Sequence, residues 1–76
     1  MSTGRTVDAR GLRCPWPVIR LARAARELGG PGNIRIIADD PIAPGEIAAL
    51  CSERGWRMSA DPDDCHAFQI IIDTVA

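Results

Sequence analysis

The positions of hydrophobic residues along this chain alternate between the helical and the strand period. Apolar residues three and four apart predict one helix over Pro15–Leu28 and another over Pro44–Arg54. Each predicted helix has a proline at its start and a glycine after its last residue, which are common start and stop signals. The residues expected to face the core are Val18, Leu21, Ala22, Ala25 and Leu28 in the first helix, and Ile47, Ala48, Leu50 and Cys51 in the second.

Four shorter apolar segments predict strands before, between and after these helices. Their expected bounds are Thr6–Ala9, Asn33–Ala38, Trp56–Ala60 and Ala67–Val75. The order is therefore βαβαββ, which is typical of an α+β chain. Because crossovers between parallel strands are right-handed, both helices are expected on one face of a four-stranded mixed sheet, in a two-layer α/β sandwich. The other face of the sheet is left for solvent or a partner.

Composition narrows the class of protein. A chain of 76 residues, 46% hydrophobic and 25% charged, is expected to fold as one small domain rather than stay disordered. We expect that domain over residues 6–76, with a flexible N-terminus over residues 1–5. A net charge of −1 argues against a dedicated nucleic-acid binder. The sequence has no apolar run of transmembrane length and no signal-peptide pattern, so we expect a cytoplasmic protein without a membrane partner.

The segment from Gly11 to Pro17 carries the strongest chemical signal, because it places a thiol at the expected first turn of a helix. Pro15 and Pro17 suit that turn, which makes Cys14 the expected cap residue. The unpaired N–H groups and the positive dipole end of a helix favour an anion there. Cysteines so placed have pKa values lowered from about 8.5 to roughly 3.5–7.5. We therefore predict that Cys14 is a nucleophile; the alternative is a cysteine that only packs or caps.

Two loops are expected to meet beside this thiol. In open α/β sheets the loops that follow parallel strands lie at one edge, where ligands usually bind. This brings the 11–14 loop next to the 39–43 loop. Asp39 and Asp40 precede a proline and a helix, so their expected role is to shape the loop near Cys14. The convergence of the two loops favours a site at Cys14.

These residues resemble those of a known family, the TusA/SirA sulfur carriers. The segment from Gly11 reads Gly-Leu-Arg-Cys-Pro-Trp-Pro, it follows Val-Asp, and Ile-Ile-Ala-Asp-Asp-Pro comes about twenty-five residues later. The resemblance extends from about Thr6 to Asp73. It implies a fold similar to the C-terminal domain of translation initiation factor three, with sheet order 1-2-4-3 and an antiparallel last strand.

The resemblance also implies a function for Cys14, which is catalytic in this interpretation. In the family the motif cysteine takes sulfane sulfur as a persulfide from a donor, such as a cysteine desulfurase or a rhodanese, and passes it to an acceptor protein. The chain would thus be a sulfurtransferase that acts as a relay, in tRNA thiolation, cofactor synthesis or sulfur oxidation. No cofactor is expected, and the chain is expected to be a monomer or weak dimer. The residues expected to support the site are Arg13, Pro15, Pro17, Asp39 and Asp40.

This chain departs from the family pattern at two positions. Trp16 stands where the tRNA-thiolation members have an acidic residue, and Glu46 stands where an aspartate is usual. On a helical wheel Trp16 falls opposite the core face, in line with Arg20 and Arg23. These three residues are our candidates for partner binding. The alternative is that Trp16 only packs over the Arg20 guanidinium, as a cation–π pair.

A local basic patch around the thiol has two interpretations. It would face an acidic partner surface or an RNA backbone, or it is solvated surface charge, and direct tRNA contact is not our expectation. The patch would consist of Arg10, Arg13, Arg20 and Arg23.

The other two cysteines carry weaker signals. Cys51 lies on the apolar face of its helix and is predicted to be a core cysteine. Cys65 and His66 resemble a ligand pair, but nothing else stands at metal spacing, so no metal site is predicted. The alternative to a sulfur carrier is a non-catalytic interaction or regulatory module, which would use the free sheet face or the Trp16 stripe and would need no reactive thiol.

Overall fold

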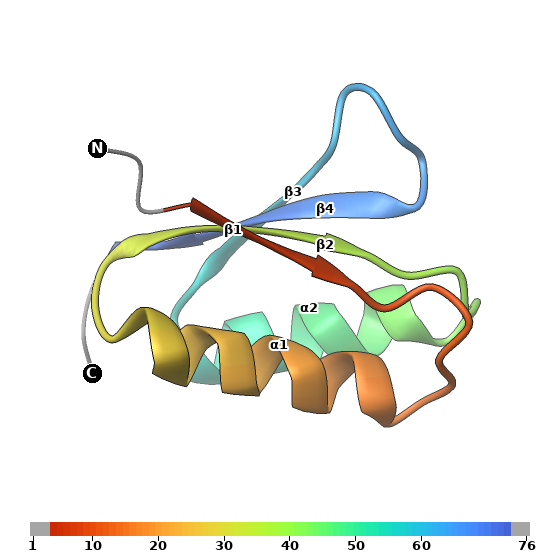
Figure 1. Cartoon of the computed structure of the whole chain (residues 1–76), viewed down its shortest axis with the longest axis horizontal. Helices are drawn as coiled ribbons and strands as arrows, with labels where there is room; N and C mark the ends of the chain where they lie inside the picture. The colour runs from red at the N-terminus through yellow and green to blue at the C-terminus, as the bar shows by residue number, and fades with distance from the viewer. Residues whose placement is uncertain (1–3, 74–76) are drawn as a thin grey trace.

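The computed structural model describes residues 4–73 and has the predicted element order, βαβαββ (Figure 1). Where both ends of an element are described, its predicted bounds are within one or two residues. The end predicted for the last strand, Val75, lies outside the described residues. The elements are β1 (Gly4–Asp8), α1 (Trp16–Leu28), β2 (Gly32–Ile37), α2 (Ala43–Arg54), β3 (Arg57–Ala60) and β4 (Ala67–Ile72).

The four strands form one mixed sheet in the order β1-β2-β4-β3. β1 pairs with β2 in parallel, and β4 pairs antiparallel with both β2 and β3. Figure 1 shows α1 and α2 side by side on one face of the sheet, where they contact each other. The expected two-layer sandwich is therefore confirmed, and so is the sheet order that the family resemblance implies.

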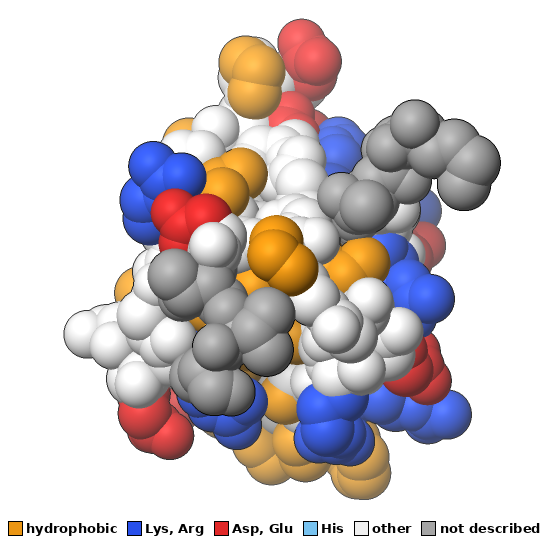
Figure 2. All heavy atoms as spheres, turned by 90° about the vertical axis from the view of Figure 1, so that its left-hand side faces the viewer, with side chains coloured by type: hydrophobic (Ala, Val, Ile, Leu, Met, Phe, Trp, Pro, Cys, Tyr) orange, Lys and Arg blue, Asp and Glu red, His pale blue; other side chains and the backbone are white. Residues whose placement is uncertain are grey.

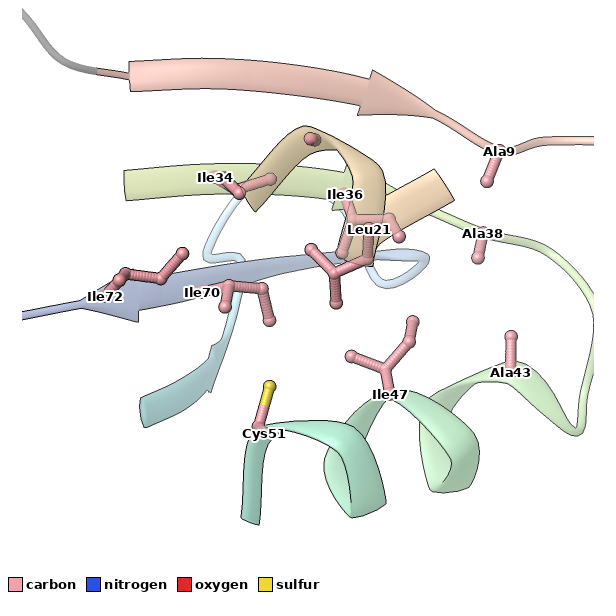
Figure 3. Close-up of a cluster of buried hydrophobic side chains, with 11 residues drawn as sticks. Ala9, Leu21, Ile34, Ile36, Ala38, Ala43, Ile47, Cys51, Ile70 and Ile72 are labelled. Carbon is pink, nitrogen blue, oxygen red and sulfur yellow. The ribbon is translucent and has the colours of Figure 1, made fainter. Parts of the chain in front are cut away.

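The core lies between the helices and the central strands. Ile34 and Ile36 of β2 and Ile70 of β4 point toward the helices and are fully buried. Figure 3 shows that the Cys51 sulfur points into the same cluster, so the prediction of a core cysteine is confirmed. Burial of one large aliphatic side chain stabilises the fold by about 1.5–3 kcal/mol.

The buried faces of the helices differ from the predicted ones at two positions. In α1 the fully packed residues include Ala24, whereas the predicted Ala22 is only half-buried. In α2 the predicted Ala48 is exposed, while Ala43 is buried. Each step along a helix turns the side chain by about 100°, so a residue next to a core position can point away from the core.

The sheet face without helices carries a cluster of bonded polar side chains, next to Ile37, Ala67 and Ile71, which the strand register puts on the same face. Asp61, which is buried, accepts hydrogen bonds from Arg35 (2.8 Å) and Gln69 (2.9 Å). The Arg35 hydrogen bond, together with the Asp63 backbone N–H, lowers the pKa of Asp61 to about 2. Gln69 in turn accepts a bond from Asn33 at 3.2 Å.

Charges of both signs are mixed on the surface. Figure 2 shows the end of the molecule where the termini lie, and arginine and acidic side chains are interspersed there. No helix within residues 4–73 is both long and apolar enough to cross a bilayer.

Candidate functional site

An open pocket of about 510 Å³ lies where the β1–α1 loop meets the β2–α2 loop. The expectation that these two loops share one edge of the sheet is therefore confirmed. The pocket is lined by Gly11, Arg13, Cys14, Asp39, Asp40, Pro41 and Ile42.

Two aspartates hold the loops together. Asp39 Oδ1 accepts a hydrogen bond from the Gly11 N–H at 3.0 Å, and Asp40 Oδ2 accepts one from the Cys14 N–H at 2.7 Å. The other oxygen of Asp40 accepts from the Ile42 N–H at 3.2 Å. These backbone bonds lower the pKa of Asp40, with a smaller contribution from the Arg13 charge. The aspartates thus fix the backbone on which the thiol sits.

The start of α1 corrects the predicted cap. The helix begins at Trp16 with Pro15 in the cap position and no side-chain cap bond, so Cys14 lies one residue before the cap. A turn that precedes the helix, closed by the bond from the Trp16 N–H to the Arg13 carbonyl (2.8 Å), moves the thiol back. The Cys14–Pro15 peptide bond is cis, and Pro17 is buried in the first turn.

The surroundings of the Cys14 sulfur overturn the predicted low pKa. The half-buried thiol donates a hydrogen bond to Glu46 Oε1 at 3.5 Å. Partial burial raises the pKa of Cys14, and so do the Glu46 hydrogen bond and charge and, to a smaller extent, the charge of Asp40. Because both carboxylates disfavour a nearby thiolate, the expected effect of the helix start does not prevail. In the free protein at neutral pH, Cys14 therefore favours the thiol over the thiolate.

Sequence reasoning missed two residues beside the thiol. Glu46 stands in the first turn of α2, and the sequence analysis names it only as a departure from the family pattern. Its place at the start of the helix that follows the 39–43 loop was the available signal. Ile42 lines the pocket and leaves 60% of its surface exposed.

The predicted partner stripe on α1 is exposed. Trp16 leaves 55% of its surface open, and Ile19, which the sequence analysis did not single out, leaves 45%. Arg20 and Arg23 are exposed as well, with Arg23 paired to Glu27 at 3.2 Å.

The packing of Trp16 over Arg20, offered as an alternative, is not what the structure shows. Within residues 4–73 the cation–π contact joins Arg54 to Trp56, at 5.7 Å from the ring centre. The basic patch also has less net positive charge than its four arginines imply, because Arg10 is paired with Asp8 at 2.9 Å.

The third cysteine lies outside the pocket, on the loop between β3 and β4. Cys65 is exposed, and its sulfur is 3.6 Å from His66 Nδ1. The structure adds a neighbour that the sequence analysis did not consider, since the ligand atoms of Asp64, Cys65 and His66 all lie within 4.8 Å of one another.

Fold and site together define a class of protein, a small α/β sandwich that presents one accessible thiol in an open pocket between two loops. The family described as Sulfurtransferase TusA matches residues 5–73. The chain therefore belongs to the TusA family of sulfur carriers, as the motif around Cys14 indicated.

Similar proteins agree with this assignment. The chain is 33% identical over 63 residues to the sulfur carrier protein TusA of Pseudomonas entomophila (strain L48), over 83% of this chain and 79% of that one. It is 34% identical over 62 residues to that of Pseudomonas putida (strain GB-1), over 82% and 78%. The crystal structure of a SirA-like protein from Desulfitobacterium hafniense superposes with a TM-score of 0.73 at 29% identity, covering 90% and 93% of the two chains.

Proposed function

We propose that Cys14 holds the carried sulfur as a persulfide and that the protein acts as a sulfurtransferase. The observation that supports this most strongly is the position of the Cys14 thiol, which is half-exposed in the pocket between the β1–α1 and β2–α2 loops. Cys51 is 2% exposed inside the core, and Cys65 lies outside that pocket. A sulfur that two proteins must reach in turn has to be accessible.

The proposed loading step is a thiol–persulfide exchange, which needs no external oxidant or reductant. The Cys14 thiolate attacks the terminal sulfur of a donor persulfide, so a new S–S bond forms at Cys14 and the donor S–S bond breaks. The donor leaves as a thiolate and takes up the proton that Cys14 gave to solvent. Unloading repeats the exchange, with an acceptor thiolate as the attacking group. A cysteine desulfurase or a rhodanese that carries a persulfide fits the donor role.

Because carboxylates lie beside Cys14, the rate of this exchange is expected to depend on the charge that the partner brings to the pocket. Glu46 and Asp40 disfavour the thiolate while the protein is alone. A cationic side chain of a docked donor that reaches Glu46 would offset that charge and lower the pKa of Cys14. The thiol would then become reactive mainly within the complex with its donor.

Exposed apolar residues around the pocket fit a protein partner. Trp16 and Ile19 on α1 and Ile42 on the neighbouring loop are large, exposed side chains. Aromatic and arginine residues most often anchor interfaces, which supports roles for Trp16, Arg20 and Arg23. A reducing compartment such as the cytoplasm suits three free cysteines.

The alternative of a non-catalytic interaction module receives no support from the sheet. On its uncovered face the polar side chains are already bonded within the chain, namely Arg35, Asn33, Gln69 and Asp61.

A relay assay tests the proposal. A cysteine desulfurase with cysteine, or a rhodanese with thiosulfate, loads the carrier, and sulfur that reaches a thiol acceptor is measured after the donor has been removed. We expect Cys14→Ser to reduce transfer to background, while the matched variant Cys65→Ser transfers as wild type does. Transfer by Cys14→Ser at the wild-type level would overturn the role of Cys14.

A further inference from the structure

We propose that Asp64, Cys65 and His66 form a binding site for a divalent metal ion of the zinc type. The site lies on the loop between β3 and β4 and uses none of the residues that line the Cys14 pocket. It is thus a second site, with a chemistry separate from sulfur carriage.

The distances between the ligand atoms suit a tetrahedral ion. Bond lengths of about 2.3 Å to sulfur and 2.0–2.1 Å to nitrogen put the two ligand atoms about 3.5 Å apart at a tetrahedral angle. Cys65 Sγ lies 3.6 Å from His66 Nδ1. Asp64 Oδ1 lies 3.9 Å from the same nitrogen, and all three ligand atoms lie within 4.8 Å of one another, so the carboxylate must move closer to the sulfur to bind the same ion.

The three ligand types select the class of metal. Thiolate, imidazole and carboxylate together suit zinc, because a hard ion such as magnesium takes oxygen ligands and avoids sulfur. Coordination through His66 Nδ1 requires the proton on Nε2. Three protein ligands leave a fourth position of the tetrahedron open for water or another molecule.

The backbone of the loop is fixed at both ends of the cluster. The carbonyl of His66 accepts from the Ala38 N–H at 2.9 Å, and the carbonyl of Asp64 accepts from the Ala67 N–H at 3.0 Å. Asp64 Oδ1 also accepts from the His66 N–H at 2.9 Å. A carboxylate oxygen has two lone pairs, so this bond leaves Asp64 able to bind a metal. The three ligands are therefore brought together before any ion binds.

The charges around the loop favour a cation. Asp63 and Asp64 are neighbours there, while the acidic Asp61 is engaged by Arg35. Asp64 influences two nearby cations, Arg10 and Arg35. However, Asp8 holds the Arg10 guanidinium with both oxygens at 2.9 Å, and Asp61 holds Arg35 at 2.8 Å. Arg10 therefore has a partner of its own and does not need the Asp64 carboxylate.

Titration of the reduced full chain with zinc chloride, followed by calorimetry, tests the site. Cobalt(II) serves as a coloured substitute, because a thiolate ligand adds a charge-transfer absorption that a carboxylate or imidazole does not give. The variants are Cys65→Ser, His66→Ala and Asp64→Asn, with Cys14→Ser as the matched thiol control. All three altered residues are on a surface loop, and amide NMR spectra of each variant verify that the fold is kept.

We expect one zinc ion per chain. Cys65→Ser and His66→Ala should each weaken binding at least about tenfold, a loss that even an outer-shell change causes. Cys14→Ser should bind zinc as wild type does. The proposal fails if wild type does not bind zinc at millimolar concentration, if Cys65→Ser binds as tightly as wild type, or if Cys14→Ser removes the binding.

Discussion

Cys14 and Cys51 both have thiols with raised pKa values, and burial contributes to both, but neighbouring charges add to it only at Cys14. Burial among apolar side chains accounts for Cys51, which is 2% exposed. Cys14 is half-exposed, and the charges of Glu46 and Asp40 add to its partial burial. The burial that raises the pKa of Cys51 is lost only when the protein unfolds. The charge that raises the pKa of Cys14 can be neutralised by a bound partner.

This difference shows that the pKa of a resting thiol is a poor guide to its use. Both thiols have raised pKa values, but only Cys14 is accessible, and only its pKa is expected to fall when a cation reaches the pocket. Cys14 is then the one whose reactivity can be switched, since Glu46 contacts its sulfur. The four predictions below test this contrast.

The largest effect concerns access. In the native protein we expect a small haloacetamide to alkylate Cys14 at least about a thousandfold faster than Cys51, because Cys51 reacts only when the core opens. Mass spectrometry of the separate peptides over time measures both rates. In denaturant the two rates should converge, and a ratio near one in the native state would contradict the core position of Cys51.

The second effect concerns the partner surface. We expect Trp16→Glu to reduce sulfur transfer to or from at least one native partner by an order of magnitude or more, since loss of an interface anchor costs about 2 kcal/mol and 1.4 kcal/mol is tenfold. Alkylation of Cys14 at a pH above its pKa, where an added charge no longer changes the thiolate fraction, should stay nearly unchanged, because Trp16 is on the surface. Arg26→Glu, a change at another exposed position of α1, is the control. If Trp16→Glu transfers sulfur at the wild-type rate with every partner, Trp16 has no role in partner binding.

The third effect concerns the charge of Glu46. Glu46 raises the pKa of Cys14, so Glu46→Gln should lower it and increase the thiolate fraction at neutral pH. Alkylation at pH 7 should then rise several-fold, up to about tenfold for a shift of one unit, and the two proteins should react equally well above both pKa values. Glu53→Gln, on the same helix and exposed, should leave the pH profile unchanged. A slower Glu46→Gln at pH 7 would contradict this electrostatic explanation.

The smallest effect concerns Cys51 itself. Cys51→Ala removes a buried sulfur and should lower the free energy of unfolding by about 1 kcal/mol, which moves the melting temperature by roughly 4–8 °C in a domain of this size. Sulfur transfer per folded molecule should not change. Thermal unfolding and the relay assay measure the two quantities, and a loss of transfer larger than the loss of folded protein would show that Cys51 takes part in the chemistry.

Much of the fold was predictable because its signals are local. The helical spacing in α1 and α2, their prolines and glycines, and the apolar runs of β2 and β4 all lie within single segments. The position of Cys51 follows from one helix face. Even the meeting of the two loops follows from the topology of parallel strands.

The chemical state of Cys14 was not predictable in this way, because distant residues determine it. Its backbone N–H bonds to Asp40, which is 26 positions away, and its sulfur bonds to Glu46, which is 32 positions away. A helix start alone favours a thiolate, but the sequence does not show how close those carboxylates come. The sequence offers Cys65 and His66 as a possible ligand pair but does not show the third member, Asp64, because a turn brings its side chain back toward His66.

The most direct test of the central claim locates the sulfur after loading. The loaded protein is alkylated to trap persulfides and cleaved after arginine, which puts Cys14, Cys51 and Cys65 on three separate peptides. We predict that the peptide with Cys14 gains the mass of one sulfur atom and that the other two do not. Sulfur on the Cys65 or Cys51 peptide, with the Cys14 peptide unmodified, would contradict the claim that Cys14 carries the sulfur.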